Sequence, residues 1–312
     1  MIYGPDDRAP DHLRGAALAI GNFDGVHMGH RALIAAAAAQ GGLCAAMTFE
    51  PHPRRFFQPD APPFRLTSAR TKNRLLQEAG ADHVFAYVFD AGLAALDGQA
   101  FIDRILVENL GVSHVVVGED FAFGRNRSGT VDTLRQSGAF GVTVVPPVMM
   151  ADGTPYASTA ARTALTAGDL DAAARILGQA WEIDMPVIHG DKRGRLLGYP
   201  TANQAAGEYL RLPYGIYAVR VQIEGEKTWR AGVANFGIRP MFEIAQPIFE
   251  TFIFDFAGDI YGKNMRVVPV HRLRGEQAFD SLDALVVQMK EDCIAAKAVL
   301  ESPRHEKASD NR

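Results

Sequence analysis

The sequence predicts an α/β domain with a parallel sheet, followed by a small antiparallel β-barrel that ends in a helix. In the first part of the chain, short apolar runs typical of strands alternate with helical stretches, which is the pattern of a parallel sheet wrapped by helices. After Gly178 the chain changes to β-rich segments separated by Gly, Pro and Asn, as in small barrels. We therefore expect two domains in the 312 residues, at 1–180 and 181–312.

The first domain is expected to contain alternating strands and helices. The strands are the apolar runs 16–20, 43–49, 83–89, 113–118 and 142–145. The helices between them are expected near 29–40, 68–80, 98–110 and 130–137. Two further pieces, 158–165 and 169–177, carry Ala and Leu at helical spacing and close the domain.

The second domain is expected to be a barrel covered by one helix. Its β-rich segments are 181–189, 214–224, 229–235, 249–256 and 264–273. Ser281 is a candidate capping residue for an amphipathic helix in which Leu282, Leu285, Met289 and Ile294 pack against the barrel. The residues from 301 to 312 are expected to form a loose tail.

Composition excludes several classes of protein. Hydrophobic residues make up 47% of the chain, and 32 Lys and Arg against 36 Asp and Glu give a net charge of -4, which excludes a disordered chain and a polycationic nucleic-acid binder. No apolar run approaches the roughly 20 residues that span a bilayer, and the N-terminus lacks the pattern of a signal peptide. We therefore predict a cytoplasmic protein that binds neither nucleic acid nor membrane. Cys44 and Cys293 lie in different contexts, which predicts two buried or half-buried free thiols.

A glycine-rich turn with two histidines follows the first expected strand. The sequence GNFDGVHMGH at 21–30 leads directly into a helix, so free backbone N–H groups and the positive end of the helix dipole meet there and favour an anion. His27 and His30, three residues apart, can converge on one phosphate and donate hydrogen bonds to oxygens that gain charge in nucleotidyl transfer. A metal site on the two histidines is an alternative, but no third ligand is visible at the usual spacing.

This turn resembles the HxGH-type nucleotidyltransferase signature, in the long form found in the prokaryotic bifunctional riboflavin kinase/FAD synthetase family. The family's other segments follow in order as FEPHP at 49–53, LT at 66–67, GEDFAFG at 118–124 and STAAR at 158–162. The resemblance implies a Rossmann-like nucleotidyltransferase domain with ATP and FMN as substrates. It implies catalytic roles for His27, His30 and Arg162, ATP contacts from Gly21, Asn22, Phe23, Asp24, Gly29, Ser158 and Thr159, and flavin contacts from Pro51, Pro53, Asp120, Phe121 and Phe123.

Without the family, these segments have simpler interpretations that stay open. The Pro-His-Pro run is also a rigid loop, because proline fixes φ whether or not a ligand is present. Phe121 and Phe123 alternate like core aromatics, although aromatic faces at a Gly-bounded strand end would suit an isoalloxazine ring. Ser158 and Thr159 can merely cap a helix, whereas Arg162 one turn later can pair bidentately with phosphate.

A second phosphate-binding candidate lies at the start of the barrel. The sequence GDKRGRLLGYPTAN at 190–203 is basic and rich in glycine, but no GK[ST] closes it as in a Walker loop. Gly190, Gly194 and Gly198 permit close approach of the backbone to phosphates. Thr201 and Asn203 can supply neutral oxygen ligands to a Mg²⁺ that also binds phosphate oxygens, while a plain turn is the alternative.

The same segment resembles the most specific motif of riboflavin kinases, and GVANFG at 232–237, RP at 239–240 and DIYG at 259–262 follow as in that module. The resemblance assigns Mg²⁺ and ATP phosphate binding to Thr201 and Asn203, and flavin binding to Arg239. Glu250 falls on the family's catalytic carboxylate, which would accept the proton of the ribityl 5′-hydroxyl. From the residues alone, Glu250 is one strand carboxylate among many.

Four residues depart from the family's pattern. Ala157 stands where relatives usually carry a serine, so adenylyl transfer is expected to be weaker if that hydroxyl contacts ATP. Ile238 and Met241 replace polar residues around Arg-Pro, and Met185 replaces a frequent glycine. These three changes are expected to reshape the flavin pocket while leaving the kinase residues in place.

The resemblance covers almost the whole chain and implies a bifunctional transferase. The barrel would phosphorylate riboflavin with MgATP to give FMN, and the first domain would then join FMN to the AMP of a second ATP, releasing pyrophosphate and giving FAD. The main alternative is a riboflavin kinase with an impaired adenylyltransferase domain. A flavin-binding regulator is disfavoured by the intact motif residues, and a flavin-reducing oxidoreductase is disfavoured because the glycines do not follow G-x-G-x-x-G.

Overall fold

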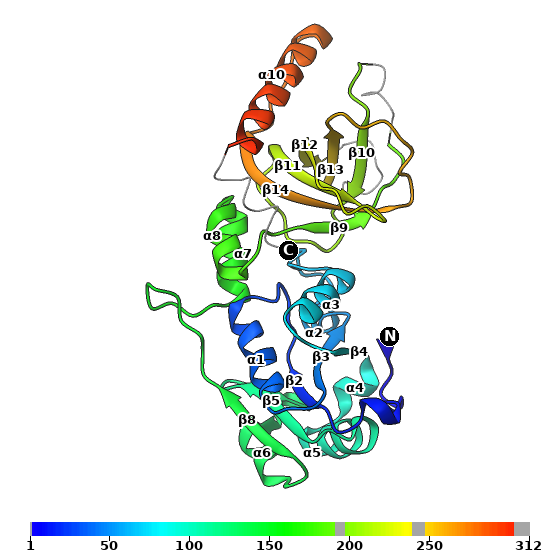
Figure 1. The fold of residues 1–312 in the computed structure, drawn as a ribbon, viewed down its shortest axis with the longest axis vertical. Helices are drawn as coiled ribbons and strands as arrows, with labels where there is room; N and C mark the ends of the chain where they lie inside the picture. The colour runs from blue at the N-terminus through cyan, green and yellow to red at the C-terminus, as the bar shows by residue number, and fades with distance from the viewer. Residues whose placement is uncertain (1, 191–196, 239–246, 303–312) are drawn as a thin grey trace. The chain divides into compact units, whose positions relative to one another are not determined.

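The computed structural model describes residues 2–190, 197–238 and 247–302, which form two compact units (Figure 1). The first unit comprises Met1–Pro62 and Ala69–Ser158, and the second comprises Pro63–Ser68 and Thr159–Arg312. The helices α7 (Ser158–Ala167) and α8 (Leu170–Leu177) therefore fall almost entirely in the second unit. Of the tail expected at 301–312, residues 303–312 lie outside the described part of the chain.

The first unit is built on a six-stranded parallel sheet. Its order is β1-β4-β3-β2-β5-β8. The strands are β1 (Ile2–Tyr3), β2 (Ala17–Ile20), β3 (Cys44–Glu50), β4 (His83–Val88), β5 (His114–Gly118) and β8 (Gly141–Val145), and all pairings are parallel. The predicted parallel sheet is confirmed, with strand ends within one residue of those expected. Only β1 was missed, because two residues carry no measurable alternation.

Helices lie between these strands as predicted, with additional short turns. The longer helices of this unit are α1 (Met28–Ala38), α3 (Ala69–Glu78), α6 (Val131–Gln136) and the wide π-helix η2 (Phe101–Leu110), which continues from α5 (Gly98–Ala100). The short elements are η1 (Asp11–Leu13), α2 (Pro53–Phe57), α4 (Ala91–Ala95), η3 (Arg125–Arg127) and the hairpin strands β6 (Ala122–Phe123) and β7 (Gly129–Thr130). Elements of two to five residues are too short to show a repeating apolar pattern, so the sequence did not reveal these pieces.

Both faces of the sheet are buried, which is why its strands read as continuous apolar runs. On β2, Ala17 and Ala19 face a cluster that contains side chains of α1 and α3. Leu18 and Ile20 face the opposite cluster, which contains side chains of η2 and α6. The strand order reverses between β2 and β5, and such a reversal is where α/β sheets bind ligands beyond the carboxyl ends of the strands.

The second unit contains a six-stranded antiparallel sheet that curls into a nearly closed barrel. Its strands are β9 (Ile183–Pro186), β10 (Thr201–Ala205), β11 (Gly215–Ile223), β12 (Arg230–Ile238), β13 (Pro247–Ile253) and β14 (Asn264–Arg274), in the order β10-β13-β12-β11-β14-β9. The Ile188–Asn203 bridge brings the two edges together, and Gln204 Nε2 donates to the carbonyl of Met185 at 2.6 Å. The predicted barrel is confirmed. Its strand β10 was missed because the polar sequence TANQA shows no alternation.

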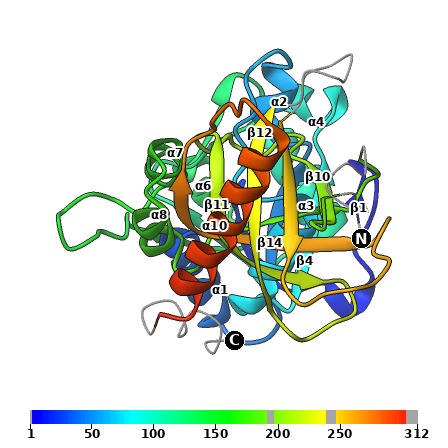
Figure 2. The ribbon, with the colours of Figure 1, turned by 90° about the horizontal axis from the view of Figure 1, so that it is seen from above.

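Helix α10 (Leu282–Leu300) runs along the outside of the barrel, against β11, β12 and β14 (Figure 2). Ser281 caps it as predicted, accepting a hydrogen bond from the N–H of Ala284 at 3.1 Å. The predicted packing face is wrong at both ends, because Leu282 and Ile294 are 67% and 61% exposed. The buried positions are instead Asp292, Ala296 and Leu300, and Asp292 forms an ion pair with Arg274 of β14.

Residues 63–68 form a short strap that belongs to the second unit although α2 and α3 of the first unit flank it. The N–H of Arg65 donates to the carbonyl of Glu208 at 3.0 Å, and the carbonyl of Arg65 accepts from the N–H of Leu210 at 2.8 Å. Trp181 Nε1 donates to the carbonyl of Leu66 at 2.8 Å. These hydrogen bonds connect the strap to residues 208–210, which precede β11, and to Trp181, which precedes β9.

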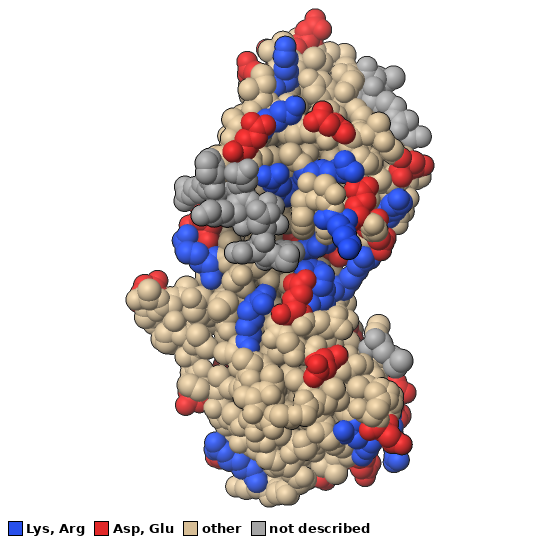
Figure 3. Space-filling model, viewed as in Figure 1, with Lys and Arg blue, Asp and Glu red and all other residues tan. Residues whose placement is uncertain are grey.

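Charge and thiols follow the expectations from composition. Figure 3 shows Lys and Arg interspersed with Asp and Glu on the face drawn. Both cysteines are free, Cys44 buried and Cys293 half-buried, as predicted. Burial raises the pKa of each thiol, so both stay protonated near neutral pH. None of the helices in the described ranges is long and apolar enough to cross a bilayer.

Candidate active sites

His27 and His30 lie close together, at the end of the turn that connects β2 to α1. His27 is the N-cap residue of α1 and only 7% exposed, and its side chain makes no capping hydrogen bond. The rings of His27 and His30 stack with their centroids 3.6 Å apart and their planes 24° apart. Phe23 packs edge-on against the ring of His30 at 5.2 Å. Two imidazoles are thus fixed at a helix N-terminus, where the dipole favours an anion.

The backbone of this turn explains why its sequence is rich in glycine. Phe23, Gly25 and Val26 all have positive φ, at 52°, 86° and 43°, so the chain reverses sharply between β2 and α1. A Cβ on Gly29 would lie 3.1 Å from the His27 ring and 3.3 Å from the carbonyl of Tyr156. Glycine at this position therefore lets the His27 ring fold back over the first turn of the helix.

Hydroxyl groups from two other elements hold the turn in place. Thr48 Oγ1 on β3 donates to the carbonyl of Asn22 at 3.1 Å. Ser158 Oγ, at the start of α7, donates to the carbonyl of Asp24 at 2.8 Å. Asp24 is itself buried. Ser158 therefore acts on the turn through its hydroxyl, in addition to any contact with a bound nucleotide.

If the first domain carries out the adenylyl transfer that the resemblance implies, Ser158→Ala is expected to weaken FAD formation from FMN by about fivefold, because one net hydrogen bond is worth about 1 kcal/mol. With Ala157 already present, this variant leaves no hydroxyl at positions 157 and 158. Thr163→Ala is the matched control, since its hydroxyl bonds to the carbonyl of Thr159 within the same helix. Steady-state rates at varied ATP would measure both, and equal losses in the two variants would contradict the role of Ser158.

Thr159 and Arg162 follow on α7, in the second unit. Thr159 is exposed. Arg162 Nε donates to the carbonyl of Phe64 at 2.8 Å, and its guanidinium carbon lies 5.5 Å from the centroid of the Phe64 ring. The strap thus orients the Arg162 guanidinium through Phe64.

The flavin candidates lie beyond the carboxyl ends of β3 and β5, the two neighbours of β2. Pro51 is exposed, and Pro53 begins α2, whose N-cap His52 accepts from the N–H of Arg54 at 3.1 Å. Phe121 stacks on Phe123 at 5.4 Å. Asp120 is exposed, Phe121 is half-buried, and Phe123 is buried in the core. The parallel sheet therefore gathers these segments at the same edge as the histidine turn.

The barrel carries a pocket of about 350 Å³ on its outer face. Thr201, Asn235, Glu250 and Phe252 line it from β10, β12 and β13. Helix α10 contributes Leu285, Met289, Asp292 and Cys293, and the segment after β14 contributes Glu276, Gln277 and Phe279. An apolar cavity with a few convergent polar groups is the usual form of a small-molecule site.

Glu250 lies at the centre of a polar row across three strands. It pairs in register with Asn203 of β10 on one side and with Asn235 of β12 on the other. Directly opposed residues of antiparallel strands project from the same face, so the carboxylate is flanked by two amides. The structure thus brings Glu250 together with Thr201 and Asn203, which the sequence had singled out separately.

The opposite wall of the pocket was not predicted. Arg274 at the end of β14 makes a bidentate ion pair with Asp292 of α10, at 2.8 and 2.7 Å. Gln288 Nε2 also donates to Asp292, at 3.2 Å. This cluster locks the helix onto the barrel and shapes the cavity. The sequence indicates this wall only through the helical spacing of Leu285, Met289 and Asp292, and the last of these is charged.

The expected phosphate cradle is described only in part. A Cβ on Gly190 would lie 2.4 Å from Asn203 Nδ2, so glycine lets the backbone approach this amide closely. Gly198 has a φ of +84°. Asn203 is buried and Thr201 half-buried. Gly194, Arg239 and Met241 fall outside the described residues, and neither Met185 nor Ile238 is among the residues that line the pocket.

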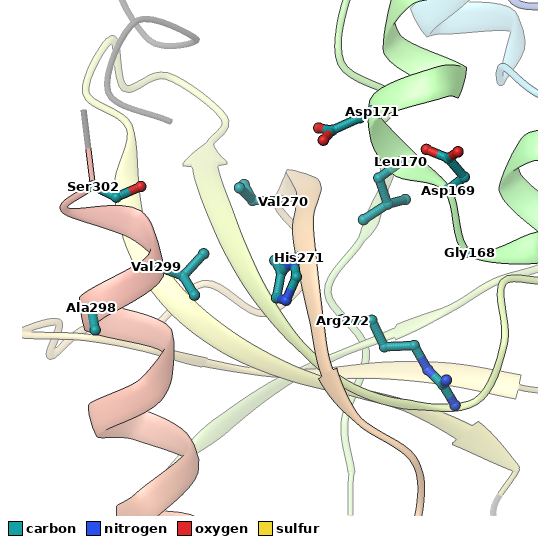
Figure 4. A pocket seen from close by; sticks show the side chains of 10 residues that line it. All are labelled: Gly168, Asp169, Leu170, Asp171, Val270, His271, Arg272, Ala298, Val299 and Ser302. Atoms are coloured by element: carbon teal, nitrogen blue, oxygen red, sulfur yellow. The ribbon is translucent and has the colours of Figure 1, made fainter. Parts of the chain in front are cut away.

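A second pocket, of about 620 Å³, lies between the start of α8, β14 and the end of α10 (Figure 4). Asp169 and Asp171 face it from one side, and His271 lies on the strand between them and α10. Asp169 caps α8 by accepting from the N–H of Ala172, and Arg272 donates to the carbonyl of Tyr214 at 2.6 Å. Asp169 and Arg272 thus serve local structure, and none of the predicted site residues lines this pocket.

A transition-metal site on the histidine pair finds no support in the part of the chain that the structure describes. There, no group of three or more His, Cys, Asp and Glu side chains is placed to hold a metal ion. Thr201 and Asn203 instead offer neutral oxygens beside the Gly190 backbone, which is a donor set for a hard cation that also binds phosphate oxygens.

Comparisons with known proteins also divide the chain into an N-terminal and a C-terminal domain. A family model described as FAD synthetase matches residues 9–160, and one described as riboflavin kinase matches residues 177–300. A solved structure described as a macrolide-efflux protein from Streptococcus pneumoniae has a TM-score of 0.79 at 29% identity, covering 93% of this chain and 97% of that one. The two folds therefore occur together in another solved chain.

Relatives with assigned names match over nearly their full length. The bifunctional riboflavin kinase/FMN adenylyltransferase of Pseudomonas fluorescens is 41% identical, covering 98% of this chain and 99% of that one. The protein of the same name from Escherichia coli is 40% identical, covering 95% and 96%. Both domains are present in the expected order, and the chain belongs to the bifunctional riboflavin kinase/FMN adenylyltransferase family.

Proposed function

We propose that the chain makes FAD in two steps, with riboflavin kinase in residues 181–312 and FMN adenylyltransferase in residues 1–180. The observation that carries the first step is the pocket in which Glu250 is flanked by Asn203 and Asn235. The second step is supported by the stacked His27 and His30 rings at the start of α1. Riboflavin, FMN and ATP are the substrates, and both reactions are group transfers.

In the kinase step, Glu250 accepts the proton of the ribityl 5′-hydroxyl, and the resulting oxygen attacks the γ-phosphorus of ATP. The bond to the β-phosphate oxygen breaks, so FMN and ADP leave. The glycines at 190, 194 and 198 let the backbone approach the phosphates, while Arg239 contacts the flavin. Arg274 and Asp292 act indirectly, because their ion pair fixes the wall formed by α10.

Thr201 and Asn203 fit a Mg²⁺ that is shared with the phosphates, because both present neutral oxygens next to the close approach at Gly190. When bound, the ion neutralises charge on the transferred phosphoryl group. The backbone carbonyl of Asn203 accepts from the Ile188 N–H at 2.8 Å, and its side-chain Nδ2 donates to the backbone carbonyl of Thr201 at 3.4 Å. Backbone and side chain of Asn203 are therefore both held at the barrel seam.

In the adenylyltransferase step, a phosphate oxygen of FMN attacks the α-phosphorus of ATP and pyrophosphate leaves. His27, His30, Arg162 and the α1 dipole stabilise the charge that develops, and no covalent enzyme intermediate is needed. The ATP contacts come from Gly21, Asn22, Phe23, Asp24, Gly29, Ser158 and Thr159. The flavin contacts come from Pro51, Pro53, Asp120, Phe121 and Phe123, with Phe123 supporting Phe121 from the core side.

A chromatographic time course with riboflavin, ATP and Mg²⁺ tests both steps in one experiment. FMN is expected to rise first and then to be converted to FAD. FMN that accumulates without FAD would favour the second candidate, a riboflavin kinase with an impaired adenylyltransferase, for which Ala157 is the motivating residue. Absence of FMN would overturn the proposal.

The two free thiols are consistent with the further proposal of a cytoplasmic location.

A further inference from the structure

Lys72 on α3 is a lysine with no exposed surface, and the adenylyltransferase chemistry above does not use it. It shares the inner face of its helix with Leu75 and Leu76, where an apolar residue would be ordinary. Burying an ammonium group is costly unless it is paired and hydrogen-bonded. A lysine at this position therefore calls for a specific set of partners.

Oxygens of three other residues lie close to the ammonium group. Lys72 Nζ lies 2.7 Å from Glu50 Oε1, 3.2 Å from the carbonyl of Phe49 and 3.4 Å from the carbonyl of Asn22. An ammonium group has three N–H donors, so each of these acceptors can take one. The Glu50 carboxylate is 12% exposed, which makes this a largely buried ion pair.

These acceptors come from two different substrate loops. Asn22 belongs to the turn after β2 that carries His27, and Thr48 Oγ1 also donates to its carbonyl. Phe49 and Glu50 end β3 and lead directly into Pro51, the first flavin candidate. One side chain thus binds the carboxyl ends of two adjacent strands, the edge at which α/β sheets bind ligands.

We propose that Lys72 is a positioning residue for adenylyl transfer, which fixes the ATP turn and the flavin loop relative to each other. This inference rests on the proposed adenylyltransferase function of residues 1–180. The attacking FMN phosphate and the α-phosphorus of ATP are held by different loops. A shift between those loops therefore changes the reaction distance even when each substrate still binds.

The chemistry of the site selects a lysine. Methionine has a similar length and fills the same volume but has no donor for the two carbonyls. Arginine presents a planar fork with five donors, which does not match three acceptors around one nitrogen atom. Only the compact ammonium group can serve both loops and the carboxylate at once.

The test compares Lys72→Met with the double variant Lys72→Met/Glu50→Gln. The single variant removes the Lys72 ion pair from the largely buried Glu50 carboxylate, so both stability and FAD formation are expected to fall. The double variant removes that charge, and its thermal midpoint is expected to return toward that of the unmodified protein. Its kcat for FMN to FAD is expected to stay about 100-fold low, the cost of a displacement on the order of 1 Å between reacting groups.

Binding measurements separate positioning from damage to the fold. In the double variant, FMN and a non-hydrolysable ATP analogue are each expected to bind with the same stoichiometry as in the unmodified protein and with affinities within about threefold of it, since each loop keeps its own contacts. Arg74→Met is the matched control, because it removes an ion pair with Glu78 from the same helix. Riboflavin phosphorylation by the same samples reports on the second unit.

The outcomes are distinct. Recovery of kcat together with stability in the double variant would overturn the inference and make Lys72 a structural residue. Loss of binding stoichiometry in the double variant would overturn it as well. An unmodified protein that makes no FAD from FMN would refute the proposed adenylyltransferase function, and the inference would fall with it.

Discussion

Glu250→Gln is expected to lower the conversion of riboflavin to FMN by about 10²–10⁴-fold, the usual contribution of a general base. The amide cannot accept the proton of the ribityl hydroxyl, but its size preserves the packing between Asn203 and Asn235. Conversion of added FMN to FAD is expected to stay unchanged, since its residues lie in the other domain. Initial rates with each flavin, followed by chromatography, measure both activities in one preparation.

Glu226→Gln provides the control for this prediction. Glu226 lies in the turn between β11 and β12 and pairs with Arg230, outside the pocket. Its variant is expected to keep both activities. Glu250→Ala extends the test, because it also removes the volume of the side chain. A Glu250→Gln enzyme that forms FMN at the original rate would remove Glu250 from its role as base.

His30→Ala has the converse expectation, with FMN accumulating and FAD formation falling by about 10²–10³-fold. That range is typical for the loss of one donor to a charge that develops in the transition state. His30 is the cleaner choice of the pair, because His27 also begins the helix as its N-cap residue. A time course from riboflavin would show a normal FMN phase followed by a stalled second phase.

His12→Ala is the matched variant for this test, since His12 is exposed in η1 and is not part of the histidine turn. It is expected to leave both phases intact. If His30→Ala or Glu250→Gln alone abolished both activities, the assignment of two independent sites would be refuted. Far-UV circular dichroism of each variant would confirm that the helices of both units are retained.

The fold was readable from sequence where burial acts on every residue of an element. The strands of the parallel sheet are covered on both faces, so each one is a continuous apolar run that ends at a turn. Strand β10 was not predicted, because its polar sequence shows no alternation. Its partners on β13, among them Glu250, lie far along the chain. The orientation of α10 was misjudged because a charged residue, Asp292, occupies the centre of its buried face.

The candidate sites were readable only where their residues are contiguous. The histidine turn is a single stretch of chain, so its type and spacing already indicate an anion site. Lys72 and Arg274 gain their significance from partners that are 18 to 50 residues away. Asn235 joins Glu250 only through the register of β12 and β13. Such side chains carry no local signal, since the fold alone brings their partners to them.

Because of the strap at 63–68, neither of the two units is a single continuous stretch of the chain. With it, the chain passes between the two units three times, so cutting at residue 180 does not separate them. The cut would separate the carbonyl of Leu66 from Trp181 Nε1 and would break the bridge between Arg65 and Tyr209. A piece of chain that keeps all of the second unit would have to include residues 63–68 and 159–180 in addition to the barrel.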